Sequence, residues 1–221
     1  RTATVTVANL APVVTADPAP TGKTEGQSVS LAYNVTDVPA DQPTLLSSWT
    51  VRRNGALVAS GNSSPVSFSA GDDGDHVVTI VGTDRDGAST TLVRAVAVAG
   101  VAPTATMTAP ATAAEGKPVD ITFSNAVDPS PVDVADGLRY AVSCDGSSLA
   151  GTTWATASTN PVRQCTFPDG PAAVTVRGRI YDADGLYTES TAVVDVTNVA
   201  PTARFVVPRD IDEGEKYTIS I

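Results

Sequence analysis

A group of landmark residues occurs twice in this chain with the same internal spacing. The landmarks are two aspartates, a glycine and a proline, and each returns 98 positions later. They are Asp84, Asp86, Gly87 and Pro103 in the first copy, and Asp182, Asp184, Gly185 and Pro201 in the second. A further joint sequence, Asn9-Leu10-Ala11-Pro12, lies 91 positions before the joint that ends at Pro103. Such a period is typical of an array of similar modules, so fold and function must be read from one repeated unit.

The period divides the 221 residues into two full modules and two partial ones. The full modules are residues 10–100 and 101–199, and about 100 residues are enough for each to bury its own core. Residues 1–9 are expected to be the last strand of a preceding module, because Thr2 to Ala8 alternates apolar and polar residues as the later closing strands do. Residues 200–221 are expected to hold the first strands of a third module.

Short alternating runs separated by turn residues fill each full module. The 16 prolines and 17 glycines make helices hard to place, while short runs of Val, Thr and Ala are typical of strands. About seven antiparallel strands are expected per module, with Trp49 in a middle strand of the first and Tyr140 in the same place in the second. The sequence therefore predicts an all-β fold, with tandem immunoglobulin-like β-sandwich modules in an elongated array.

Some strands and turns can be placed in more detail. Ser28 to Thr36 alternates along its whole length and is expected to be one core strand. Asn54-Gly55 is a hairpin signal, and Asp145-Gly146 suggests that the second module keeps the hairpin. The extra residues of that module fall in Ser147 to Pro161, a longer loop in which Trp154 is expected to pin the chain.

The two cysteines, Cys144 and Cys165, both lie in the second module among strand-like residues. They suit a cross-strand disulfide, which would indicate an oxidising, extracellular setting. Two free buried thiols are the alternative. A zinc site is less favoured because the chain's only histidine, His76, lies in the other module and is expected to be exposed to solvent.

The net charge of −10 and the sequence pI near 4.4 bear on the kind of partner. Nucleic-acid binding requires lysines and arginines that neutralise phosphates, so we expect no nucleic-acid partner. An acidic chain favours cations, although its charge can also serve solubility alone. No apolar run is long enough for a membrane-spanning helix, so no membrane span is expected in this segment.

Taken together, the landmarks resemble the PKD-like repeats of bacteria and archaea. The shared features are Asn-Val-Ala-Pro joints, Glu-Gly, Asp-Pro, a mid-strand Trp or Tyr, Asp-Gly and Asp-x-Asp-Gly, and they cover essentially the whole chain. The segments SCDGSS, QCTFPDG and RIYDADG are similar to the cysteine-paired variety found in very large secreted bacterial proteins. The chain has WTVRRNG and YAVSCDG in place of the usual Trp-Asp-Phe-Gly-Asp-Gly motif, so a neighbouring bacterial Ig-like family is the alternative.

Acidic loop residues recur at the same places in each module, and the resemblance implies a structural Ca²⁺ site where they meet. Loops from one end of a sandwich could supply the hard oxygen ligands that Ca²⁺ accepts. The candidate ligands are Asn9, Asp37, Asp84, Asp86, Asp128, Asp182, Asp184 and Asn198. Gly100 replaces the joint asparagine in the second copy, which weakens the expectation there. The alternative is that Asp-x-Asp-Gly is only a hairpin turn whose aspartates bond their own backbone.

No catalytic constellation is recognisable in the sequence, and we expect no enzyme activity. The first interpretation is a structural segment of an extracellular or cell-surface repeat protein of prokaryotes, such as a stalk, adhesin or filament subunit. Its partners would be neighbouring modules or identical subunits, through end-to-end contacts or strand addition. The alternative is a carbohydrate- or protein-binding accessory module of a secreted hydrolase, which would present a coplanar strip of exposed aromatic residues.

Overall fold

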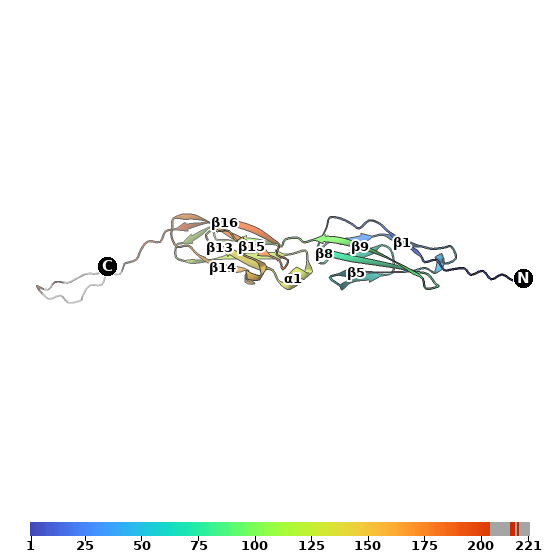
Figure 1. The fold of residues 1–221 in the computed structure, drawn as a ribbon. Coiled ribbons are helices and arrows are strands. Elements are labelled where there is room, and N and C mark those ends of the chain that lie inside the picture. The colour runs from blue at the N-terminus through green and yellow to red at the C-terminus, as the bar shows by residue number, and fades with distance from the viewer. Residues whose placement is uncertain (204–212, 215, 217–221) are drawn as a thin grey trace.

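Two β-sandwiches lie end to end and are joined by a short linker around Pro103 (Figure 1). The computed structural model describes residues 1–203, 213, 214 and 216. We call the sandwich built from strands β1 to β9 module 1 and the sandwich built from β10 to β16 module 2. The elongated array of immunoglobulin-like sandwiches predicted from the sequence is thus confirmed.

Module 1 packs a five-stranded sheet against a second layer of four short strands. The order of the five-stranded sheet is β2 (Lys23–Thr24), β9 (Ser89–Ala99), β8 (Gly74–Thr83), β5 (Leu46–Arg53) and β6 (Ala56–Gly61). In the second layer, β1 (Val13–Ala16) pairs with β4 (Tyr33–Thr36), and β3 (Ser28–Leu31) pairs with β7 (Val66–Ser69). Strand β2 runs parallel to β9, whereas the other pairs are antiparallel. A 3₁₀ turn, Gln42–Thr44, precedes β5.

The core of module 1 follows from the alternation of side chains along these strands, because successive residues point to opposite faces of a sheet. Trp49 on β5 is 7% exposed, as expected for a core residue, and its indole Nε1 donates a hydrogen bond to the Ser63 carbonyl over 2.9 Å. Gly61 on β6 faces the ring, and a Cβ atom there would lie 2.4 Å from Trp49 Cζ2. The ring therefore requires a residue without a side chain at this position.

Module 2 repeats the two-layer plan with fewer strands. Its four-stranded sheet has the order β11 (Thr112–Ala114), β16 (Tyr187–Thr197), β15 (Ala172–Tyr181) and β13 (Arg139–Ser143). The facing sheet has the order β10 (Thr104–Thr108), β12 (Pro118–Val127) and β14 (Val162–Thr166). The parallel pair recurs as β11 with β16. A six-residue helix, α1 (Pro131–Asp136), and a 3₁₀ turn, Trp154–Thr156, complete the module.

Cys144 and Cys165 form the disulfide that the sequence suggested, with their Cα atoms 5.5 Å apart. Cys144 directly follows β13 and Cys165 lies on β14, so the bond links the two sheets of module 2. Cys165 is 1% exposed and belongs to the core cluster. The disulfide expected from the sequence is therefore confirmed, and the alternatives of free thiols and zinc ligands are wrong.

Three local predictions were wrong. Ser28 to Thr36 is divided at Ala32 into β3 and β4, because its first half pairs with β7 and its second half pairs with β1. His76 is 1% exposed and stacks on Phe68, with ring centroids 5.4 Å apart. It is therefore a core residue of module 1 and not a surface histidine.

The predicted hairpin at Asp145-Gly146 is the third error. The chain turns there, but it enters the long loop without forming a returning strand next to β13. Among the residues that the structure describes, only a single bridge, between Tyr140 and Ser158, occupies that edge. Arg177 and Arg179 explain the difference, because their side chains donate to the carbonyls of Gly146 and Leu149 and hold the loop against β15.

Trp154 pins the long loop, as expected. Its Nε1 donates to the Gly137 carbonyl over 2.7 Å, and the Arg139 guanidinium lies 3.8 Å from the centre of the ring. Tyr140, which corresponds to Trp49, is only partly buried and packs against Phe123 with ring centroids 5.1 Å apart.

The predicted partial modules stay predictions. Residues 1–9 are exposed and form no strand with any described part of the chain. The expected opening strands in 200–221 fall largely outside the described residues. No helix of the described residues is long and apolar enough to cross a membrane.

Removing the disulfide should destabilise module 2 selectively. The bond joins residues 21 positions apart, so the loop-entropy model gives a loss of about 3 kcal/mol in the free energy of unfolding for the double variant Cys144→Ala, Cys165→Ala. Module 1 has its own core and serves as the internal control. Chemical unfolding followed by amide hydrogen exchange would report each module separately, and equal loss of protection in both modules would contradict the assignment.

Candidate metal centre between the modules

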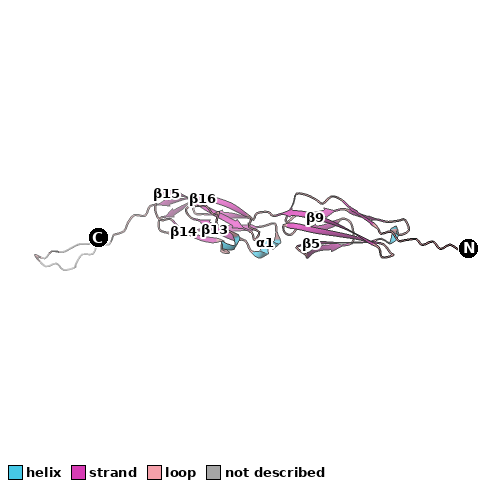
Figure 2. Cartoon of the chain, viewed as in Figure 1, coloured by secondary structure: helices cyan, strands magenta, loops and turns pink. Residues whose placement is uncertain are grey.

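Helix α1 brings an aspartate to the end of module 2 that faces module 1 (Figure 2). The helix begins after Ser130, whose Oγ accepts a hydrogen bond from Asp133 N over 3.1 Å, and it starts with Pro131. A serine N-cap followed by proline is a favoured helix start. Asp133 lies in the first turn of the helix and is 2% exposed. The helix therefore places a buried acidic side chain at the joint between the modules.

The turn between β15 and β16 contributes two more aspartates. Asp182 Oδ1 accepts a hydrogen bond from Leu186 N over 2.7 Å, and Gly185 takes a φ of 90°. This is the self-bonded aspartate turn that the sequence offered as the alternative to a metal site. It uses only one oxygen, however, because Asp182 Oδ2 is buried and finds no hydrogen-bond donor among the described residues.

Module 1 contributes Glu25 and Asp72 from two turns at its end. Glu25 Oε1 accepts a hydrogen bond from Val101 N in the linker over 2.6 Å, while Oε2 is buried without a donor in the described part of the chain. Asp72 forms a salt bridge with Arg53, which also pairs with Asp73. The glutamate therefore connects the end of module 1 directly to the linker.

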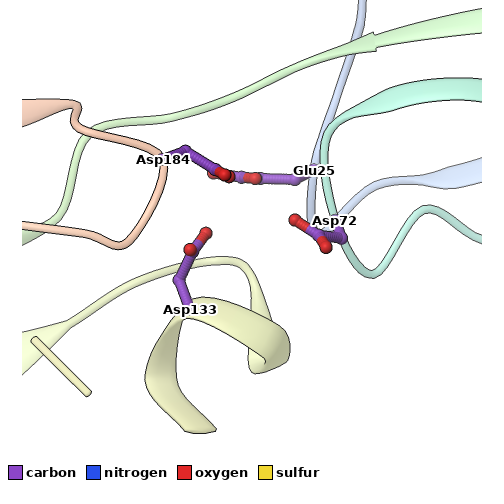
Figure 3. A group of neighbouring side chains, drawn as sticks. All are labelled: Glu25, Asp72, Asp133 and Asp184. Carbon is purple, nitrogen blue, oxygen red and sulfur yellow. The ribbon is translucent and has the colours of Figure 1, made fainter. Parts of the chain in front are cut away.

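These side chains form two groups that share Asp133. The first, which we call the joint cluster, contains Glu25, Asp72, Asp133 and Asp184, with one carboxylate oxygen of each within 4.8 Å of all the others. Figure 3 shows the four carboxylates converging from the two modules. The second, the module 2 cluster, contains Asp128, Asp133 and Asp182 within the same limit.

The pKa values of these carboxyl groups show the electrostatic cost of bringing them together. Burial raises the pKa of Glu25 to about 7, and neighbouring Asp128 and Asp133 add to the effect, while the hydrogen bond from Val101 opposes it. Burial likewise raises the pKa of Asp133 to about 6, with added repulsion from Asp184 and Asp182. Two unit charges about 5 Å apart repel by about 3 kcal/mol at an effective dielectric constant of about 20. The ionised joint therefore needs a compensating positive charge.

Three further aspartates at the joint also have raised pKa values. Burial is the main reason that the pKa values of Asp128, Asp182 and Asp184 lie above the ordinary value. Of the six carboxylates in the two clusters, only Asp72 forms a salt bridge within the described residues. Oxygen-only donor sets with several carboxylates fit a hard divalent cation such as Ca²⁺.

The predicted ligands of the first copy are arranged differently. Asn9 Nδ2 donates to Asp84 Oδ2 over 2.8 Å, so the joint asparagine and the turn aspartate do meet, as expected. Asp86 is exposed and lies 3.8 Å from Arg85, and Asp37 bonds Val38 N. No group of three closely spaced acidic oxygens includes them among the described residues. Calcium at that end stays a prediction.

Asn198 lies at the opposite end of module 2, away from the two clusters. Its amide donates to Glu115 Oε1 over 2.7 Å in the orientation that satisfies both groups. Glu115 also accepts hydrogen bonds from Val199 N and Gly170 N. The predicted ligands Asp128, Asp182 and Asp184 thus come together, whereas Asn198 belongs to another joint.

Sequence reasoning missed Glu25, Asp72 and Asp133 as site residues. Glu25 carries a readable signal, because Glu-Gly recurs as Glu115-Gly116 and Glu213-Gly214. Asp133 could have been found from Ser130-Pro131 followed by an aspartate and, later, Gly137, which is the pattern of a short capped helix. Asp72 has no such signal, since its role depends on how the modules pack.

Comparisons with known proteins leave the family open. No protein-family model and no curated protein matches the chain. Among solved structures it is similar to the fibronectin(III)-like modules of Clostridium thermocellum CbhA, at 20% identity and a TM-score of 0.33, over 84% of this chain and 95% of that one. It is also similar to Sidekick-1 immunoglobulin domains 1–4, at 16% identity and a TM-score of 0.41, over 85% of this chain and 49% of that one.

A third similar structure is the Bacteroides ovatus glucan utilization protein SGBP-B in complex with a mixed-linkage heptasaccharide. The identity is 19% and the TM-score 0.34, over 86% of this chain and 48% of that one. The chain thus spans about half the length of Sidekick-1 and SGBP-B in these structures. With TM-scores of this size, the similarity assigns the chain to no particular family. The class that the fold itself defines is a tandem array of immunoglobulin-like β-sandwiches.

The raised acidities predict a pH dependence of the protein in a metal chelator. The pKa of Glu25 rises from 4.5 to about 7 on folding, so the folded state binds more protons between these values. The contribution of Glu25 to folding stability is then full below about pH 4.5 and falls as pH rises towards 7, by about 1 to 3 kcal/mol. Thermal unfolding with chelator at pH 5.5 and 7.5 should show the higher stability at pH 5.5. The variant Glu25→Gln should reduce this difference, and a wild-type chain more stable at pH 7.5 would contradict the raised pKa of Glu25.

Proposed function

We propose that this chain is a structural spacer segment of an extracellular repeat protein, a stalk, adhesin or filament, of the PKD-like kind that its sequence resembles. Direct packing between the two modules is the observation that carries this proposal. Ser130 Oγ donates to the Gly71 carbonyl across the joint over 3.1 Å. A spacer keeps its two ends at a fixed distance only if its joints resist bending. A joint in which the modules contact each other resists bending better than a free linker.

Two glycines allow the close approach at the joint. A Cβ atom on Gly26 would lie 2.9 Å from Pro129 Cβ, and a Cβ atom on Gly100 would lie 2.8 Å from Leu186 Cδ1. Each pair joins one module or the linker to the other module. Packed contacts of this kind support a preferred angle between neighbouring modules.

The disulfide and the net charge of the chain support the proposed location and the proposed partners. A disulfide through the core of module 2 is typical of proteins that fold in an oxidising compartment, and it supports an extracellular or cell-surface location. The net charge of −10 speaks against nucleic-acid partners. Neighbouring modules, in the same polypeptide or in identical subunits, are the partners that we propose.

The spacer proposal predicts a narrow distribution of distances between the modules. Spin labels at exposed Ser60 in module 1 and Thr191 in module 2 should give one narrow distance by double electron–electron resonance in millimolar Ca²⁺. Leu186→Ala, which removes the side chain that packs on Gly100, should broaden it, whereas Val193→Ala, exposed on the following strand β16, should not. A distribution as broad as that of a flexible linker in the unaltered chain would refute the spacer proposal.

A pocket in module 2 favours the second candidate function, a carbohydrate- or protein-binding accessory module. It measures about 310 Å³, at the lower end for ligand pockets, and Phe123, Tyr140 and Leu149 contribute to its lining. The expected strip of aromatics is missing from the described residues, where Tyr187 is the exposed aromatic and packs on Tyr181. We therefore rank this function second.

Binding in this pocket would be detected by nuclear magnetic resonance titration with soluble β-glucan and other oligosaccharides. The accessory-module function predicts shifts confined to the pocket residues and their loss in Tyr140→Ala, with Tyr187→Ala as the matched control. Unchanged spectra at millimolar oligosaccharide would count against carbohydrate binding.

A further inference from the structure

We propose that a Ca²⁺ ion binds in the joint cluster, with Glu25 and Asp72 of module 1 and Asp133 and Asp184 of module 2 as its ligands. The ion would hold the two modules to each other, which makes the stiffness of the joint depend on calcium. Binding follows from the cluster alone, while the consequence for stiffness rests on the proposed spacer function.

The size of the cluster fits one coordination sphere. Ca²⁺ binds oxygens at about 2.4 Å, so two oxygens on opposite sides of one ion lie about 4.8 Å apart. All four oxygens of the joint cluster lie within 4.8 Å of one another. They come from two turns of module 1, the helix α1 and the β15–β16 turn, so no single module contains the set.

Orphaned oxygens inside the cluster are the second, independent observation. Glu25 Oε2 and Asp133 Oδ2 are buried without a hydrogen-bond donor in the described residues, and both side chains are only 2% exposed. Asp182 Oδ2, in the adjoining cluster, is buried in the same way on a side chain that is 1% exposed. Buried carboxylate oxygens normally have partners, so two such atoms in the joint cluster, with a third beside it, point to a bound cation.

The repeats of the chain provide an internal comparison for the aspartate of the turn. Asp84 in module 1 corresponds to Asp182 in module 2, and both use Oδ1 for their own turn. Asp84 Oδ2 accepts the amide of Asn9. The residue that corresponds to Asn9 in module 2 is Gly100, which has no side chain to donate. The absence of this amide leaves Asp182 Oδ2 available to a cation.

The glutamate shows the same contrast. Glu115 corresponds to Glu25, and each accepts the linker amide that follows its own module, Val199 N or Val101 N. Glu115 Oε2 also accepts Gly170 N over 2.7 Å, and the Asn198 amide lies at its Oε1. Glu25 receives no such second donor among the described residues. Protein donors thus satisfy both oxygens of Glu115 and of Asp84, whereas Glu25 and Asp182 at the joint each keep one oxygen without a donor among the described residues.

The donor set selects Ca²⁺ among common metal ions. Carboxylate oxygens alone are poor ligands for zinc, which prefers Cys and His, and neither residue type belongs to the cluster. Mg²⁺ requires a near-octahedral arrangement and retains several waters, whereas Ca²⁺ accepts irregular sets of oxygens. Contributions from four separate segments favour the less demanding ion.

Calcium titration of the whole chain by isothermal calorimetry tests the site. We expect Glu25→Gln and Asp133→Asn to weaken binding by at least about tenfold, because affinity depends on the number of charged ligands. Two matched controls remove one negative charge elsewhere: Glu115→Gln at the corresponding repeat position, and Asp120→Asn on the exposed part of β12. Both should bind Ca²⁺ like the unaltered chain. Equal binding by Glu25→Gln and the controls would overturn the shared site.

The folding of each variant is checked by hydrogen exchange in chelator, where Glu25→Gln should keep the protection of both modules. Mg²⁺ at the same concentration should produce less than one tenth of the occupancy, and equal occupancy would overturn the choice of calcium. Conservative Glu25→Asp should retain partial binding, and binding no better than that of Glu25→Gln would contradict a ligand role for this carboxylate.

Distance measurements with chelator and with Ca²⁺ separate this inference from the spacer proposal. Broadening of the distance between modules in chelator, and narrowing in Ca²⁺, supports both. Narrow distances in both conditions together with absent Ca²⁺ binding would overturn the ion but leave the spacer intact. Ca²⁺ binding lost in Glu25→Gln, with broad distances in every condition, would support the shared site and refute the stiff spacer.

Discussion

Repulsion between carboxylates at the joint is the constraint on which the arrangement of the two modules depends. Each module packs around a core of its own, the first around Trp49 and the second around the Cys144–Cys165 disulfide. Their mutual placement is different, because it brings Glu25 and Asp72 against Asp133 and Asp184. Ionised, these groups repel one another. The packing at Gly26, Gly71 and Gly100 opposes that repulsion. The stability of the packed joint therefore depends on the positive charge that compensates the carboxylates.

The repeats conserve a backbone plan within the chain but satisfy its polar groups differently at each end. The parallel closing pair, the Glu-Gly turn and the self-bonded aspartate turn occur in both modules. Small substitutions then change the chemistry. Asn9 donates a hydrogen bond to Asp84, whereas Gly100 has no side chain to donate one to the corresponding Asp182. One repeated framework can therefore build joints of different character.

Local periodicity predicted the parts of the fold that depend on neighbouring residues. Trp49 lies in a core strand, β5, and Asn54-Gly55 forms the hairpin that follows it, because alternation and turn chemistry act over a few positions. The break at Ala32 and the burial of His76 depend on contacts with distant strands, so they could not be read in this way. Of the joint residues, Asp128, Asp182 and Asp184 were predicted from their turns. Asp72 becomes part of the cluster only through the angle between two modules, which no single repeat encodes.

The parallel pairs β2–β9 and β11–β16 give each module a particular response to mechanical load. Each pair joins the opening segment of a module to its closing strand, with two paired positions in module 1 and three in module 2. The two ends of each module lead away from the pair in opposite directions along the array (Figure 1). Tension along the array would pull the paired strands past each other, and their hydrogen bonds, which lie across the strands, would be loaded in shear and together. Peeling them one at a time would require much less force, so this topology suits a chain that is stretched from its ends.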